Sequence, residues 1–241
     1  MTKDIFVIGN GPSLNDIDMS LLKDVDTISF NRAYIAYKEW GFCPTYYMVI
    51  DRAGISSYNK DINELIISSP IKRFFIATYH NHLKPYTDRS VFSTTRNNVT
   101  FLQHNTNPIF DVEKKNSFGL VEKFKLTSSV TISALPILYA MGYENVYLLG
   151  CDAKYKNCGS GTQTGTENND TDHFRNDYFG KGIKFGGANK TGFFKPWVDI
   201  KPELDRMKGL GFSVISCTKD SALHNIGYEY KDFNDIIQLI K

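Results

Sequence analysis

The chain has 241 residues, of which 41% are hydrophobic and 22% are charged, and its formal net charge is +2. A chain of this size and composition can bury a sizeable core without disulfides, so we expect a globular protein of one large or two small domains. It has neither an apolar run that could span a membrane nor a basic cluster, so we expect no nucleic-acid partner and at most peripheral membrane contact.

The four cysteines have neither C-x-x-C spacing nor zinc-site spacing, and they suit a reducing compartment. The first predicted strand begins almost at the start of the chain, which leaves no room for a signal peptide. We therefore expect a cytoplasmic protein. A homo-oligomer is compatible with these features.

The first predicted element is a buried strand at 5–8 that runs directly into Gly9-Asn10-Gly11-Pro12-Ser13. The two glycines permit a tight turn and a close approach of a ligand to the backbone, and Pro12 and Ser13 suit the first turn of a helix. Free amides at such a helix start favour phosphate. The third glycine of the dinucleotide fingerprint and the Gly-Lys-Ser/Thr of a Walker A loop are absent, so a purely structural turn remains the alternative.

The following segments alternate short apolar strands with helices. The pattern predicts strands at 27–30, 45–50 and 73–77, and helices at 17–23, 33–40 and 62–69. This alternation predicts a parallel sheet with helices on its faces. Residues 80–125 show little periodicity, apart from a candidate strand at 99–102.

The second half of the chain begins with a clear helix and strand. Residues 127–141 predict a helix that Thr or Ser caps and Pro136 bends, and a buried strand at 145–150 ends in Cys151-Asp152. Further helices are expected at 195–210 and 232–241, with a strand at 212–216. Neither a repeat nor a linker divides the chain, so we expect a single domain over 1–241.

Residues 153–194 are rich in Gly, Asn, Thr, Asp and Lys and poor in aliphatic side chains. A structureless segment of this length is uncommon inside a compact domain and is often a functional lid. We therefore expect a flexible lid here, with a disordered surface insertion as the alternative. Within it, 173–178 (HFRNDY) gathers aromatic and titratable residues.

Polar side chains follow several of the predicted strands, namely Asn10, Asn31, Asp51 with Arg52, and Asp152. The carboxyl ends of parallel strands meet at one edge of a sheet, where ligands bind, so these side chains should converge. The capped helix start at 125–129 adds hydroxyl groups. The result suits a nucleotide, although each residue alone also fits a role in a turn or cap.

Four features together carry a family resemblance: GNGPSL after the first strand, Asn31 after the second, Asp51 after the third, and TSSVTISALPILYAMGYENVYLLGCD at 127–152. They resemble the glycosyltransferase family 42 sialyltransferases. They also resemble the wider domain-of-unknown-function family 115, which includes the motility-associated-factor flagellin glycosyltransferases. The resemblance implies an α/β fold with a Rossmann-like, mostly parallel sheet, helices on both faces (a GT-A-like variant) and a mobile lid.

The resemblance also implies an activity. Such enzymes are inverting glycosyltransferases that need no metal cofactor. They move a nonulosonic acid, sialic acid or a relative, from a CMP-sugar donor to a glycan hydroxyl, as in lipopolysaccharide or capsule biosynthesis. The expected partners are thus a nucleotide-sugar donor and a glycan acceptor.

Pocket position and resemblance together give the expected site residues. We expect the nucleotide to be bound by Gly9, Asn10, Gly11, Pro12, Ser13, Asn31, Asp51, Thr127, Ser128, Ser129 and Asp152. We expect substrate contacts from Arg32, Arg52 and Lys125. Lys125 stands where the family has Arg, and Asp51 stands where the sialyltransferases have Asn.

The expected catalytic residues lie in the lid. Tyr155 is one place from the family tyrosine that steadies the departing phosphate, and Tyr178 could supply another hydroxyl. The sialyltransferases use a His three residues after a Tyr, a position that Lys181 occupies here. We choose His173 as the general base because an imidazole pKa suits a hydroxyl proton near neutrality. Lys181 remains the other candidate, and His173 could instead be a solvent-exposed loop residue.

Two other functions stay open. Family 115 also resembles archaeal pterin diphosphokinases, which use ATP and magnesium; Asp51 and Asp152 could then hold the metal. A non-catalytic nucleotide-binding module would keep the loop but not need His173. Metal dependence and removal of His173 separate these functions.

Overall fold

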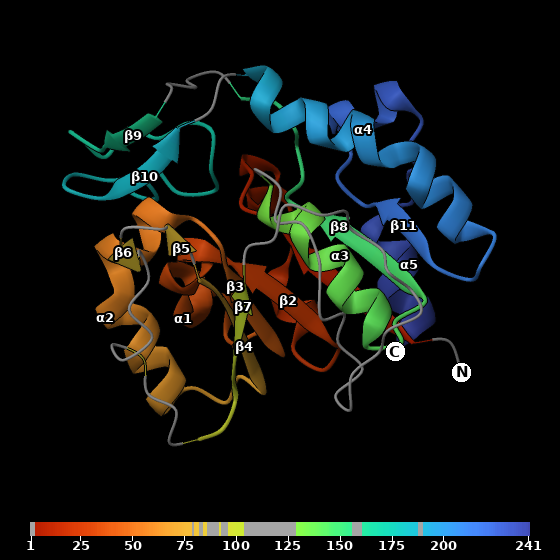
Figure 1. Ribbon diagram of the computed structural model, residues 1–241. Coiled ribbons are helices and arrows are strands. Elements are labelled where there is room, and N and C mark those ends of the chain that lie inside the picture. Colours follow the sequence, from red (N-terminus) through yellow and green to blue (C-terminus); the bar gives the residue numbers. More distant parts are fainter. Residues whose placement is uncertain are drawn as a thin grey trace.

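The computed structural model describes residues 3–78, 80–81, 84–85, 92, 96–103, 129–155, 161–187 and 190–241. Its centre is a seven-stranded sheet in the order β11-β8-β1-β2-β3-β4-β7, with every neighbouring pair parallel (Figure 1). Its strands are β1 (Asp4–Ile8), β2 (Thr27–Phe30), β3 (Tyr46–Val49), β4 (Arg73–Thr78), β7 (Val99–Gln103), β8 (Asn145–Leu149) and β11 (Ser213–Ser216). The predicted parallel α/β fold is confirmed.

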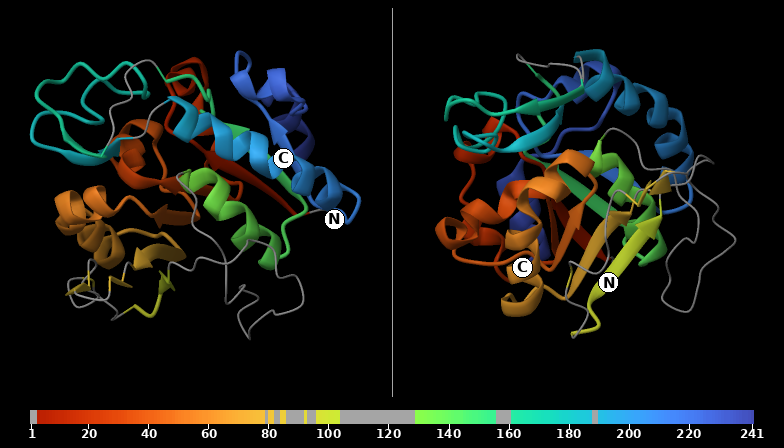
Figure 2. Two further views of the ribbon diagram at one scale, coloured as in Figure 1. Left: turned by 45° about the horizontal axis from the view of Figure 1, so that its top comes forward. Right: turned by 60° about the vertical axis from the view of Figure 1, so that its left-hand side comes forward.

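Helices cover both faces of the sheet. They are α1 (Tyr37–Trp40), α2 (Arg52–Ser68), α3 (Val130–Ala140), α4 (Lys190–Lys208) and α5 (Phe233–Ile240). Figure 2 shows α1, α2 and α5 on one face and α3 and α4 on the other. For α1 to α4 this division follows from right-handed crossovers, because the chain moves one way along the sheet from β1 to β4 and the opposite way from β7 to β11.

The core strands are buried on both faces, which explains why they read as continuous apolar runs in the sequence. All four residues of β2 and the last four of β1 and of β8 are buried. Aromatic rings also pack between the helices and the sheet. Phe233 of α5 packs edge-on against Phe6 of β1, with ring centroids 5.6 Å apart.

The strand order reverses between β1 and β8. From β1 the chain proceeds to β2 on one side, whereas β8 pairs with β1 on the other side. This reversal makes the carboxyl ends of β1 and β8 a topological switch point of the sheet. Ligands of open α/β sheets bind at such a switch point.

Four predicted helical segments differ from the observed ones in length or type. The predicted turn of helix after Gly11 is only the five-residue 3-10 helix η1 (Pro12–Asp16), and residues 17–23 contain only η2 (Met19–Leu22). By contrast, α2 begins at Arg52 and not at residue 62. The predicted helix at 33–40 is split into η3 (Asn31–Ala36) and α1, which ends at Gly41 with φ +74°.

The expectation that 153–194 lacks regular structure is wrong. Strands β9 (Gly161–Thr164) and β10 (Lys184–Gly187) form an antiparallel hairpin, and α4 begins at Lys190. The hairpin lies against α2 through backbone donors: the amide of Lys184 donates to Ser57 Oγ at 3.0 Å and that of Gly186 to Asp51 Oδ2 at 3.2 Å. We call residues 161–187 the hairpin segment.

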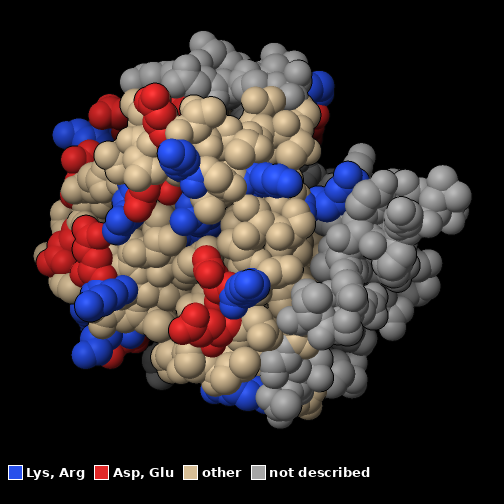
Figure 3. All heavy atoms as spheres, turned by 90° about the vertical axis from the view of Figure 1, so that its left-hand side faces the viewer, with Lys and Arg blue, Asp and Glu red and all other residues tan. Residues whose placement is uncertain are grey.

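Three short elements complete the described chain: β5 (His80–Asn81), β6 (Lys84–Pro85) and η5 (Ala222–Ile226). On the face drawn in Figure 3, basic and acidic side chains are interspersed. Within the described residues, no helix combines the length and apolar character that crossing a bilayer requires.

Candidate functional site

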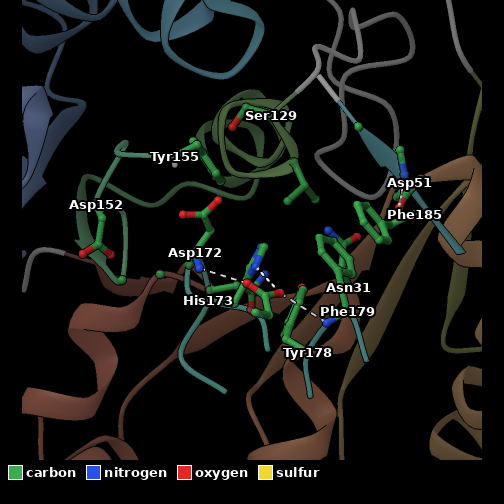
Figure 4. A pocket seen from close by; sticks show the side chains of 18 of the residues that line it. Asn31, Asp51, Ser129, Asp152, Tyr155, Asp172, His173, Tyr178, Phe179 and Phe185 are labelled. Carbon is green, nitrogen blue, oxygen red and sulfur yellow. Dashed lines mark hydrogen bonds and ion pairs between the residues drawn. The ribbon is translucent and has the colours of Figure 1, made fainter. Parts of the chain in front are cut away.

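A cavity of about 520 Å³ opens at the carboxyl ends of β1, β2, β3 and β8, beneath the hairpin segment (Figure 4). The structure brings many of the expected site residues together there. Those that line the cavity are Gly9, Asn10, Gly11, Asn31, Asp51, Arg52, Ser129, Asp152, Tyr155, His173 and Tyr178.

The remaining expected residues are not part of this lining. Pro12, Ser13, Arg32 and the alternative base Lys181 do not line the cavity. Lys125, Thr127 and Ser128 lie outside the described residues.

The loop after β1 uses its amides to hold the loop after β8, which contradicts the predicted cradle of free amides for phosphate. The amide of Gly9 donates to Leu149 O at 2.7 Å, and that of Gly11 donates to Gly150 O at 2.9 Å. In addition, η1 is too short to carry a substantial helix dipole. The amides of Gly9 and Gly11 are therefore not free to bind an anion.

Asp152 fills the place where an anion was expected. Its Oδ2 accepts a hydrogen bond from Ser13 Oγ at 2.8 Å, and a Cβ on Gly11 would lie only 1.8 Å from the same oxygen. Burial raises the pKa of the Asp152 carboxyl, although its hydrogen bonds from Ser13 oppose that effect. The glycine at position 11 thus makes room for a carboxylate of the protein itself.

Asn10 and Asn31 present oxygen acceptors at the ends of β1 and β2. Asn31 has a φ of +49°, in the left-handed region where Asn is better tolerated than most residues. The Oδ1 atoms of both side chains are buried and have no hydrogen-bond partner within the described part of the chain. An unpaired buried oxygen costs about 1–3 kcal/mol, a penalty that ligand donor groups could remove.

Asp51 caps α2 and anchors the hairpin segment. Its Oδ1 accepts from the Ala53 amide at 3.0 Å and its Oδ2 from the Gly186 amide at 3.2 Å. Burial raises the pKa of Asp51, and these backbone hydrogen bonds act in the opposite direction. The residue therefore joins the wall of the cavity to its cover.

Arg32, predicted to contact substrate, instead fastens the hairpin segment to the sheet. Its Nη1 donates to Asp177 O at 2.9 Å and also to Tyr178 O, while its amide donates to the Tyr178 hydroxyl at 3.3 Å. The guanidinium is thus turned toward backbone carbonyls. Arg32 does not line the cavity, and its predicted substrate contact stays a prediction.

His173 lies in the cavity wall, packed among aromatic rings. Its side chain is 13% exposed, and its Nδ1 lies 2.8 Å from Oδ2 of Asp170. Its ring is stacked on Tyr178 with centroids 4.2 Å apart and meets Phe179 edge-on at 4.7 Å. The expectation that His173 could be a freely exposed loop residue is therefore wrong.

The two tyrosines differ in what they offer the cavity. Tyr155 is partly exposed and its ring lies 6.4 Å from that of His173. Tyr178 is 1% exposed, and its hydroxyl accepts from the Arg32 amide. Desolvation raises the pKa of Tyr178 well above its usual value. The prediction that its hydroxyl assists a leaving group is not supported; its ring supports His173.

The lining residues that were not predicted from the sequence include Asp170, Asp172, Phe179 and Phe185. The two aspartates could have been noticed, since they precede His173 by three residues and by one. Asp172 is 8% exposed, and in Figure 4 its carboxylate points toward Tyr155. The phenylalanine rings stack with centroids 3.9 Å apart, a contact made across the hairpin segment that sequence spacing does not reveal.

The predicted metal pair of Asp51 and Asp152 does not form. Figure 4 shows the two residues on opposite sides of the cavity, with Tyr155 and His173 between them. Each carboxylate already accepts hydrogen bonds from the protein. Among the described residues, no group of three or more His, Cys, Asp or Glu side chains is arranged to hold a metal ion.

Comparison with known proteins identifies the family of the chain. Residues 1–158 match the family model described as "6-hydroxymethylpterin diphosphokinase MptE-like". The chain belongs to this MptE-like family. The family resemblance inferred from the sequence is thereby confirmed. No curated protein matches the sequence.

Solved structures share the fold of this MptE-like chain. The MAf glycosyltransferase of Magnetospirillum magneticum AMB-1 matches with a TM-score of 0.53 and 14% identity over 96% of this chain and 34% of that chain. This chain thus spans about a third of the length of that protein. The Campylobacter jejuni sialyltransferase CstII, in complex with cytidine-5'-monophosphate, matches with a TM-score of 0.51 and 15% identity over 97% of this chain and 87% of that chain.

A further CST-II structure, in complex with a trisaccharide acceptor and CMP, has a TM-score of 0.51 and 15% identity over 96% of this chain and 88% of that chain. At these identities the likeness concerns the fold. It confirms the expected Rossmann-like α/β architecture of the MptE-like chain.

Proposed function

We propose that the chain is an inverting glycosyltransferase that moves a nonulosonic acid, sialic acid or a relative, from a CMP-sugar to a glycan hydroxyl. The observation that carries this proposal is the imidazole of His173 in the wall of a cavity at the switch point of the sheet. Support also comes from the fold that the chain shares with two glycosyltransferases, one of them solved with CMP. Lys181, the other candidate base, does not line this cavity.

In the proposed reaction, His173 takes the proton of the acceptor hydroxyl. The acceptor oxygen forms a bond to the anomeric carbon from the face opposite the CMP phosphate, and the bond from that carbon to the phosphate oxygen breaks. The electron pair leaves with CMP, so negative charge grows on the phosphate. Hydroxyl and cationic groups directed at this charge stabilise the transition state. Tyr155, Arg52 and Lys154 line the cavity and are the candidates for this role.

We propose that the nucleotide binds along the strand ends. Donor groups of the nucleotide would satisfy the buried Oδ1 atoms of Asn10 and Asn31. Gly9 and Gly11 would shape the wall without donating their amides, which the protein already uses. Contacts from Asp51, Ser129 and Asp152, and from Lys125, Thr127 and Ser128, stay predictions.

The remaining expectations are proposals of the same kind. We propose that 1–241 forms one nucleotide-binding transferase domain in which 153–194 covers the donor, and that catalysis needs no metal. A role in lipopolysaccharide or capsule biosynthesis, cytoplasmic location, peripheral membrane contact and a homo-oligomer stay predictions.

The direct test measures CMP release from CMP-sialic acid, with and without EDTA, and the affinity for CMP by calorimetry. His173→Ala should lower turnover by roughly 10²–10⁴-fold, because it removes the general base, while CMP affinity persists. His224→Ala is the matched control, since this histidine bonds Ser216 at 3.2 Å and does not line the cavity. Near-normal turnover of His173→Ala would remove His173 from the mechanism.

A second candidate function is that of an ATP-dependent pterin diphosphokinase, which the description of the matched family favours. It predicts binding of ATP that depends on magnesium, whereas the glycosyltransferase proposal predicts binding of CMP in EDTA. A calorimetric titration of each nucleotide in both conditions separates them. Tight CMP binding without turnover by the wild type would instead favour a non-catalytic nucleotide-binding module.

A further inference from the structure

The carboxylate of Asp170 is held rigidly beside His173. Its side chain is 9% exposed. Its Oδ1 accepts from the Asp172 amide at 2.9 Å, and its Oδ2 accepts from the Phe179 amide at 3.3 Å and lies 2.8 Å from Nδ1 of His173. Two backbone amides thus fix the carboxylate in front of one particular imidazole nitrogen.

The imidazole ring is held as firmly as the carboxylate. The ring planes of His173 and Tyr178 differ by 6° with centroids 4.2 Å apart, and Phe179 closes one edge. Tyr178 is itself fixed, because its hydroxyl accepts from the Arg32 amide. A flip that exchanged the two ring nitrogens would break the hydrogen bond to Asp170.

An ionised carboxylate can only accept a hydrogen bond, so the nitrogen that faces it must carry the proton. Burial is the largest single influence on Asp170 and would raise its pKa, but the hydrogen bond and charge interaction with His173, together with the hydrogen bonds from the Asp172 and Phe179 amides, outweigh it and keep that pKa below its usual value. The carboxylate is therefore ionised near neutral pH. Nδ1 of His173 then carries hydrogen, and the lone pair of a neutral ring lies on Nε2.

We infer that Asp170 is a positioning residue: it holds His173 in the Nδ1–H tautomer, so that Nε2 is the atom that takes the proton of the acceptor hydroxyl. This inference rests on the proposed transferase function. After proton transfer His173 carries both ring protons, and the Asp170 carboxylate stabilises the imidazolium without taking a proton itself. The same pairing serves hydroxyl activation in enzymes of unrelated fold.

The deciding variant is Asp170→Asn. Its amide oxygen can still accept from the Asp172 amide, which keeps the shorter of the two backbone hydrogen bonds, while the weaker one from the Phe179 amide is lost. Its amide nitrogen then faces Nδ1 and donates to it, which moves the imidazole proton to Nε2 and blocks proton acceptance there. Asp232→Asn is the matched control, because Asp232 accepts from the amide two residues on, at 2.8 Å, in the same way but bonds no histidine among the described residues.

Two measurements test the inference separately from the proposed function. Long-range ¹H–¹⁵N NMR of His173 needs no substrate: the wild type and Asp232→Asn should show protonated Nδ1, and Asp170→Asn should show protonated Nε2. CMP release by Asp170→Asn should fall roughly 10²–10⁴-fold while its Kd for CMP changes less than about threefold.

The outcomes are distinct. A wild-type spectrum with the proton on Nε2 would overturn the inference without recourse to any variant. The inference would also be overturned if Asp170→Asn changed the tautomer of His173 but released CMP at the wild-type rate. If the wild type releases no CMP from any CMP-sugar but the proton moves as expected, the proposed function fails and the assignment of the tautomer to Asp170 stands.

Discussion

Replacing Gly11 with alanine should destabilise the protein by forcing apart the loops after β1 and β8. The new Cβ would lie 1.8 Å from Asp152 Oδ2 and 2.8 Å from Gly150 O, both closer than the 3.0 Å that real Cβ contacts respect. The carboxylate must therefore move by more than 1 Å, which breaks its 2.8 Å hydrogen bond from Ser13. Losing a hydrogen bond to a charged group costs about 1.5–3 kcal/mol, and the contact with the backbone oxygen adds about 1–3 kcal/mol.

The expected loss is thus about 2.5–6 kcal/mol, or at least about 5 °C in Tm for a chain of this size. Thermal unfolding followed by circular dichroism measures it. The control is Gly209→Ala, whose Cβ would lie 3.3 Å from its nearest neighbour. In a double-mutant cycle, Asp152→Ala should recover part of the loss in Gly11→Ala, because the main clash is then gone. A wild-type Tm for Gly11→Ala, or strict additivity in the cycle, would refute the reasoning.

Two further predictions concern the hairpin segment. Arg32→Lys loses the guanidinium hydrogen bonds to two backbone carbonyls. Amide hydrogen exchange in 170–183 should therefore accelerate at least about tenfold, while exchange in β1 stays unchanged. Equal exchange rates in the variant and the wild type would contradict the anchoring role of Arg32. The pKa of Asp170 is lowered in the folded protein, so its ionised form stabilises the fold. This stabilisation is fully present at a pH well above 3.8, the pKa of the unfolded chain, and it is lost as the pH falls through the lower pKa of the folded state. Urea unfolding between pH 5 and about 2.5 should therefore show a shallower loss for Asp170→Asn than for the wild type, and parallel curves would contradict this sign.

The sheet, and the edge of it that carries the cavity, could be predicted because short stretches of sequence identify each strand and its end. Strands buried on both faces appear as short apolar runs, as in IFVI of β1 and VYLL of β8, and polar residues such as Asn31 mark where strands end. Parallel pairing then brings those ends to one edge whatever their separation in the chain. Physical rules for parallel sheets were thus sufficient for the site's position.

The start of α2 was missed because its first turns contain weak helix formers. Gly54, Ser56 and Ser57 each disfavour a helix interior, so only the Asp51 cap and the later apolar spacing signal the helix. The hairpin was missed because β9 buries no apolar face. Backbone amides of the hairpin donate hydrogen bonds to side chains of α2 and its cap. Because every residue except proline has such an amide, these bonds produce no recognisable pattern in the sequence of the hairpin.

The failure of the predicted phosphate cradle has a different cause. A glycine-rich turn after a strand offers amides to whatever lies nearest, and the sequence does not say what that is. Here the acceptors are Leu149 O and Gly150 O, from a strand that lies about 140 residues away in the chain. The same holds for Arg32, whose partners belong to the hairpin segment. Long-range partners of local motifs require the structure.

The most direct test of the central claim, that the strand ends form a nucleotide site, is a calorimetric titration of CMP in EDTA into the wild type and Asn31→Gly. Glycine accepts the φ of +49° at this position, so the variant removes the buried acceptor without straining the backbone. We expect one CMP per wild-type chain and an affinity at least about tenfold weaker in the variant. No CMP binding by the wild type, or equal affinity in both proteins, would contradict the claim.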